Sequence, residues 1–185
     1  VGLLEGFKDI ADKFVRVRVA DIDSIDIGRF EFDFDLTMMV FFASADGHIY
    51  GRYGGRDGTD ADARQSLAGL RYAMEAALQA HQQREEKPRQ AMPKNRPIYP
   101  TDLARGRRRG SCVHCHQIKE MLNADLKRKN QWSRDLIWRY PLPDNLGIEL
   151  EVDRGNVVRN IVPDSPAAQV GLRPGDVVKR LNDMP

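Results

Sequence analysis

Both cysteines of the chain lie in one pentapeptide, Cys112-Val113-His114-Cys115-His116. No disulfide can therefore tie distant segments together, and the fold must depend on its apolar core. The 185 residues are 41% hydrophobic, which is enough for one or two domains with cores of their own. The net charge of +2 gives no case for nucleic-acid binding.

The pentapeptide has the spacing C-x-x-C followed directly by histidine, which is the attachment signature of c-type haem. Each thiol forms a thioether with one haem vinyl group, and the adjacent histidine becomes an axial ligand of the iron. The sequence therefore predicts one covalent haem c. Cys112 and Cys115 are its expected anchors, and His116 is the expected proximal iron ligand.

The second axial ligand of the iron is left open by the sequence. Suitable donor atoms are carried by His48, His81, Met92, His114 and Met121. His114 shares a turn with His116 and points away from the iron, and Met121 is better explained as a core residue of the following helix. The distal candidates are Met92, in a flexible linker, and His81, near the end of a helix. Met92 and His81 can each instead have a packing or surface role without binding iron.

Two other chemistries use the same pentapeptide. A C-x-x-C pair at the start of a helix is also typical of a redox-active dithiol, whose first thiol is activated by the helix N-terminus. A thioredoxin-type pair is expected after a strand, however, and a basic segment precedes this one. Zinc is the third reading, with Cys112, Cys115 and two local histidines as ligands. Adjacent positions on a single turn do not easily form a tetrahedron, so haem is favoured.

Residues 1–83 show the periodicities of a mixed helix and strand domain. The predicted elements are a helix, a strand, a buried central strand, a returning strand and a second helix, at residues 3–14, 15–20, 37–43, 48–53 and 60–83, respectively. Asp46-Gly47 predicts the hairpin turn between the third and fourth elements.

This order of elements resembles the later part of a thioredoxin-like domain, most specifically over the hairpin segment 40–47. The first strand and the dithiol of that family are not found, and Thr37-Met38 stands where the family places a cis-proline. The resemblance therefore implies a retained scaffold without thiol chemistry of its own, incomplete at its N-terminus.

Charge is unevenly distributed along the chain. Six carboxylates and one arginine lie between Asp21 and Asp35, and we expect this stretch to be a solvated connection. Residues 84–110 carry nine Lys/Arg, three acidic residues and four prolines, which predicts an extended basic linker. The haem-binding segment is expected at 111–141, with a helix that continues from the pentapeptide to about Lys129.

The last stretch, residues 142–185, resembles the first half of a bacterial PDZ domain. The resemblance rests on the loop Asn145–Ile148, on the strand Asn156–Ile161 and on the segment Ser165–Val178. In such domains the loop captures the carboxylate of a peptide that pairs with the next strand. The given sequence stops before the helix that completes the groove, so its open strand edge predicts pairing with the missing residues or, by self-association, with another subunit. Ser165 is expected to be a helix cap.

The expected fold class is α+β / α/β, with a partial thioredoxin-like domain, a helical c-type haem segment and a partial PDZ-like β domain. The combination resembles a family of extracytoplasmic bacterial proteins that join these three parts. Covalent haem attachment implies maturation outside the cytoplasm. The sequence begins at Val1 without methionine or a signal-peptide pattern, so we expect that a leader has been removed or left out. Periplasmic, secreted or cell-surface localisation is expected. No apolar run has membrane-spanning length, so no integral membrane segment is expected.

The function favoured by the sequence is that of a monohaem c-type cytochrome in extracytoplasmic electron transfer, alone or within a multi-subunit assembly. Its expected partners are redox proteins. One alternative is a PDZ-type interaction adaptor with a redox-sensing haem, and another is a thiol-disulfide oxidoreductase that uses the C-x-x-C pair. No nucleophile–base–acid constellation is found elsewhere, so no catalytic residues and no enzyme activity are expected.

Overall fold

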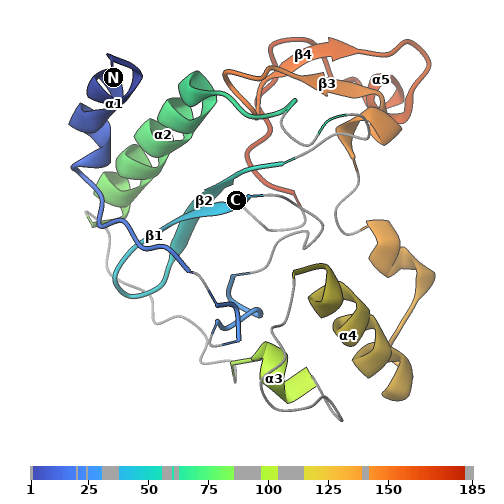
Figure 1. The fold of residues 1–185 in the computed structure, drawn as a ribbon. Helices are drawn as coiled ribbons and strands as arrows, with labels where there is room; N and C mark the ends of the chain where they lie inside the picture. Colours follow the sequence, from blue (N-terminus) through green and yellow to red (C-terminus); the bar gives the residue numbers. More distant parts are fainter. Residues whose placement is uncertain are drawn as a thin grey trace. The chain divides into compact units, whose positions relative to one another are not determined.

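Helices and two small antiparallel sheets make up the described part of this computed structural model, which is an α+β architecture (Figure 1). The residues described are 2–19, 21–23, 25–30, 38–55, 60, 63–85, 97–103, 115–138 and 142–181. Contacts divide the chain into two units, one formed by residues 1–15, 37–91 and 139–185 and the other by 16–36 and 92–138. The domain boundaries, the thioredoxin-like fold and the PDZ-like fold expected from the sequence stay predictions.

The first unit begins with helix α1, Gly2–Ala11, which ends three residues before the predicted boundary. Ile10 and Ala11 are buried and pack in one core with Phe42, Tyr53 and Met74. The apolar spacing of three and four residues therefore predicted the helix and its buried face correctly.

The strand predicted over residues 15–20 is wrong for residues 15–19, which form no strand. Val15, Val17 and Val19 are 94%, 81% and 53% exposed. Alternation of apolar and charged residues produces a strand only where a neighbouring strand completes its hydrogen bonds, and none does so in the described part of the chain.

The hairpin predicted around Asp46-Gly47 is confirmed. Strand β1, Val40–Ala43, pairs antiparallel with β2, Ile49–Tyr53, and Gly47 adopts a φ of +83° in the connecting turn. Within the described residues β1 pairs with β2 alone, and the central position that its apolar run predicted stays a prediction. Its apolar character is explained by the core, because Phe42 is only 5% exposed.

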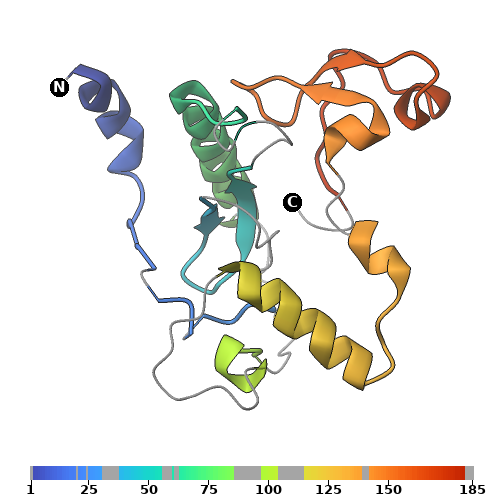
Figure 2. The same ribbon diagram turned by 45° about the vertical axis from the view of Figure 1, so that its right-hand side comes forward.

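Helix α2, Leu67–Glu85, covers this hairpin and contacts β2 and α1 (Figure 2). It begins seven residues later than the predicted start at residue 60, because Ser66 acts as the N-cap. The Ser66 Oγ accepts a hydrogen bond from the N–H of Gly69 at 2.9 Å, which satisfies one of the free amides of the first turn. Met74 and Ala77 are buried on the inner face of α2.

The second unit contains α3, Pro100–Leu103, and α4, Cys115–Arg128, followed by a short 3-10 helix, η1, Arg134–Trp138. Residues 100–103 of the predicted linker form α3 and are therefore not extended. Just before α3, Ile98 O accepts the Ile27 N–H at 2.9 Å, and Asp26 Oδ1 accepts the Ile98 N–H at 3.1 Å. Asp26, expected to be solvated, therefore pins two segments that lie far apart in the sequence.

The C-terminal part of the first unit begins with a 3-10 helix, η2, Pro143–Leu146. Strand β3, Ile148–Leu150, then pairs antiparallel with β4, Val158–Ile161, and α5, Pro166–Gln169, follows. The Oγ of Ser165 accepts the N–H of Ala168 at 3.2 Å, which confirms the predicted cap.

Candidate functional site

The candidate site is the pentapeptide that leads into α4. This helix begins at Cys115 and carries His116 in its first turn, and it ends at Arg128, which confirms the helix predicted to about Lys129. Cys112, Val113 and His114 lie outside the described residues, and Cys115 and His116 are described in their backbone alone. The roles of Cys112, Cys115 and His116 as anchors and ligand therefore stay predictions.

α4 is held in the second unit by Ile118, which is 0% exposed. Ile118 forms a core with Ile27, and four partly buried side chains pack against this pair: Ile22, Leu103, Met121 and Leu122. Ile118, Met121 and Leu122 follow the spacing of one helix face. Successive residues of a helix are about 100° apart, so the backbone position of His116 lies on the side of α4 away from Ile118.

This packing decides one residue that was considered as a distal ligand. Met121 belongs to the core around Ile118, as expected from its position in the helix. Met92 and His114 lie outside the described residues, so their roles stay predictions.

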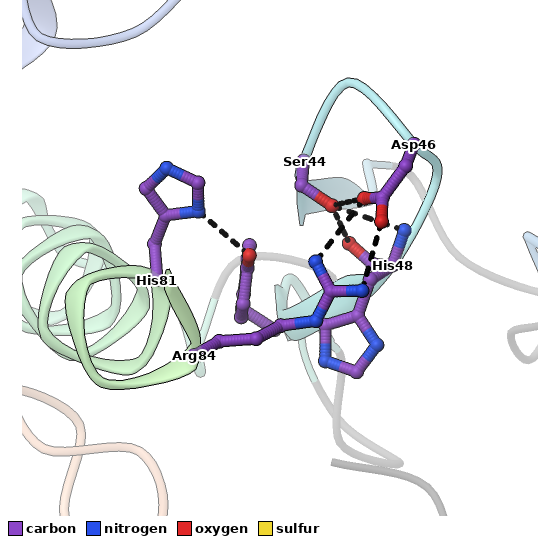
Figure 3. Close-up of polar contacts among 6 residues, drawn as sticks. Ser44, Asp46, His48, His81 and Arg84 are labelled. Carbon is purple, nitrogen blue, oxygen red and sulfur yellow. Dashed lines mark hydrogen bonds and ion pairs between the residues drawn. The ribbon is translucent and has the colours of Figure 1, made fainter. Parts of the chain in front are cut away.

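His81 is a half-buried residue of α2 and hydrogen-bonds Tyr50 across the hairpin (Figure 3). Its Nδ1 lies 2.6 Å from the Tyr50 hydroxyl oxygen, and the two rings meet edge-on with centroids 5.3 Å apart. His81 belongs to the first unit and α4 to the second, so the role of His81 as a distal ligand stays a prediction.

A polar cluster not predicted from the sequence surrounds the hairpin turn. The guanidinium of Arg84 reaches from the end of α2 to Asp46, with Nη2–Oδ2 and Nη1–Oδ1 distances of 2.8 and 3.2 Å (Figure 3). Ser44 Oγ also hydrogen-bonds the Asp46 carboxylate and accepts the His48 N–H at 3.2 Å. The local sequence predicts a turn at Asp46. It gives no sign of the ion pair with Arg84, which lies 38 residues away.

The bond from Arg84 is the main reason why the pKa of Asp46 lies well below its usual range, and the Ser44 hydroxyl adds to this effect. The lowered pKa keeps the Asp46 carboxylate ionised near neutral pH, so it can pair with the Arg84 guanidinium. The ion pair between Arg84 and Asp46 joins the hairpin turn to the end of α2.

His48 gives this region a pH-dependent stability. Burial lowers its pKa below the ordinary 6.5, and the positive charges of Arg84 and Arg180 lower it further, whereas Asp46 raises it. The unfolded chain therefore binds the proton more readily, and stability falls as the pH drops from about 6.5 towards the lower folded value.

We expect urea unfolding to show a lower midpoint at about pH 5.5 than at about pH 7.5, with part of this difference lost in a His48→Gln variant. An identical pH difference in the two proteins would contradict the role of His48.

Within the ranges that the structure describes, no three His, Cys, Asp or Glu side chains gather where they could hold a metal ion. No helix among the same residues has the length and apolar character needed to cross a membrane. Comparison with known proteins adds no relative, since no family model, curated protein or solved structure matches the chain.

Proposed function

We propose that this protein is a monohaem c-type cytochrome that transfers electrons outside the cytoplasm, alone or as part of a multi-subunit assembly. The observation that carries the proposal is the pentapeptide Cys112–His116, which holds the chain's two cysteines and runs into α4 at the second of them. Two thiols and an imidazole are the donor set that covalent haem requires, so the residues fit the group.

The residues of the chain have separate tasks in this proposal. Cys112 and Cys115 hold the cofactor by covalent bonds, and His116 is the proximal ligand. Ile118 packs α4 against the core of its unit. The first turn of α4, which contains Cys115 and His116, therefore belongs to a packed helix. The haem, when bound, supplies reversible one-electron exchange.

The expected partners are redox proteins. The basic segment 84–110 favours partners with acidic surfaces, because complementary charge raises the rate at which two proteins meet. This interaction would weaken as salt is added, because surface charges are screened.

The proposal is tested on protein exported and matured in a host that attaches c-type haem. We expect a haem c absorption spectrum on reduction, an intact mass that exceeds the polypeptide by one haem, and colour that stays with the protein through acid-acetone extraction. A colourless protein with the mass of the bare polypeptide under these conditions contradicts the proposal.

A second candidate, thiol-disulfide oxidoreductase, is favoured by the same start of α4. A thiol beside a helix N-terminus has a lowered pKa and becomes a better nucleophile. The two candidates are separated by titrating thiols in the unfolded protein: thioethers leave no reactive thiol, whereas a reduced dithiol leaves two.

A further inference from the structure

The turn between β1 and β2 depends on two particular residues in succession. Gly47 has a φ of +83°, a backbone conformation that residues with a side chain rarely adopt. Asp46, directly before it, supplies the carboxylate that binds the guanidinium of Arg84. The fold therefore places an Asp-Gly pair in this turn. Aspartate isomerises most readily before glycine, because glycine has no side chain to shield its backbone nitrogen.

Isomerisation of an Asp-Gly pair takes two steps and needs neither a cofactor nor an oxidant. The backbone nitrogen of the glycine first attacks Cγ of the protonated aspartate. A C–N bond forms, a C–O bond breaks, and the carboxyl OH leaves as water together with the amide proton. Water then adds to the main-chain carbonyl carbon of this succinimide, whose bond to the nitrogen breaks. The product is isoaspartate, which continues the chain through Cγ and carries a free carboxylate on Cα.

The native turn keeps both reacting groups unreactive. The N–H of Gly47 donates to the carbonyl oxygen of Ser44 at 2.9 Å. The Asp46 carboxylate accepts bonds from Arg84 at 2.8 and 3.2 Å and a further bond from the Ser44 hydroxyl (Figure 3). These bonds favour the ionised form, and the pKa of Asp46 is lowered by Arg84 first and by Ser44 next. An ionised carboxylate does not release water, so the first step is slow.

The ion pair that protects the turn is accessible to solvent. The Asp46 side chain is 37% exposed and the Arg84 side chain is 20% exposed. Ion pairs with this exposure are weak in water, so the pair opens from time to time without any rearrangement of the core. Water for the second step reaches the turn in the same way.

We propose that Asp46-Gly47 is a modification site, which isomerises spontaneously to isoaspartate when its ion pair with Arg84 opens and which Arg84 protects in the native protein. Isoaspartate adds one atom to the backbone of the turn and moves the carboxylate to Cα. The ion pair that joins the turn to the end of α2 is then lost. None of the haem-binding residues takes part, so the proposal stands or falls independently of the proposed cytochrome function.

The site is tested by ageing the full matured protein for weeks at about pH 6, where ordinary carboxyls are still protonated in part. Trypsin cleaves after arginine, so Asp46-Gly47 falls in the peptide 30–52. The second Asp-Gly pair of the chain, Asp57-Gly58, falls in the peptide 57–64 and reports any general opening of the protein. The aspartate and isoaspartate forms of each peptide have equal mass, and they are separated by chromatography and distinguished by electron-transfer fragmentation.

We expect R84A to isomerise at Asp46 at least about fivefold faster than the wild type, because well above its pKa the protonated fraction of a carboxyl rises about tenfold when the pKa rises by one. The rate at Asp57 should be the same in both proteins. R71A is the matched control, because it removes the same side chain from α2, where Arg71 pairs with Asp9 at 2.8 Å. It should isomerise at Asp46 as the wild type does.

Equal rates at Asp46 in the wild type and R84A would overturn the proposal. An equal acceleration at Asp46 in R71A, or at Asp57 in R84A, would also overturn it, because a general loosening of the fold would then explain the effect. If R84A fails to fold, S44A replaces it with the same expected direction and the same controls, since the Ser44 hydroxyl also binds the carboxylate.

Discussion

An Ile118→Ala variant is expected to lose about 2–5 kcal/mol of unfolding free energy, because the truncation removes three carbon atoms from a fully enclosed position. Ile118 is 0% exposed and shares its core with Ile27. The small size of this core leaves few side chains that could move into the cavity. The loss is measured as a lower urea midpoint at an unchanged dependence on urea concentration.

Ile98→Ala is the matched control for this prediction. Ile98 belongs to the same unit and has the same side chain, but it is 41% exposed, so its truncation should cost less than about 1 kcal/mol. Its backbone bonds to Asp26 and Ile27 do not depend on the side chain. Equal losses in the two variants would contradict the placement of Ile118 in the core that fixes α4.

The features predicted correctly from the sequence are those that depend on near neighbours. Asp46-Gly47 specifies a tight turn, Ser165 caps the helix directly after it, and the spacing of Ile118, Met121 and Leu122 defines one face of α4. Each of these patterns is complete within one or two turns of chain, so local stereochemistry is enough to predict it.

The features that the sequence did not predict depend on partners far along the chain. The valines at 15, 17 and 19 alternate as in a strand, but alternation does not supply a neighbouring strand. Asp26 binds the backbone of Ile98, 72 residues away, and Arg64 binds Leu150, 86 residues away. Such pairs leave no periodic signal, because one charged residue can be satisfied by many others.

The candidate site divides in the same way. The roles of the anchors and of the proximal ligand stay predictions, which the sequence alone can make because all three residues lie within five consecutive positions. The distal ligand has no such constraint, because it approaches the iron from another part of the fold. The contact of His81 with Tyr50 depends on tertiary packing, which the spacing of residues along the chain does not predict.

The double variant Cys112→Ala/Cys115→Ala is expected to lose covalent haem completely, because each thioether needs its own sulfur and the chain has no other cysteine. Either single variant keeps one sulfur and is expected to attach less haem, through a single bond. Attachment is measured by haem staining after denaturing electrophoresis and by intact mass, since neither readout detects haem that is bound without a covalent link.

His114→Ala is the matched control for these variants, because His114 lies between the two cysteines but has no role as an anchor in the proposed site. It should attach haem as the wild type does. Haem that stays bound to the double variant under denaturing conditions would contradict the assignment of both anchors. Loss of haem from His114→Ala would show that attachment also needs His114, and the loss in the double variant could then not be assigned to the two sulfurs alone.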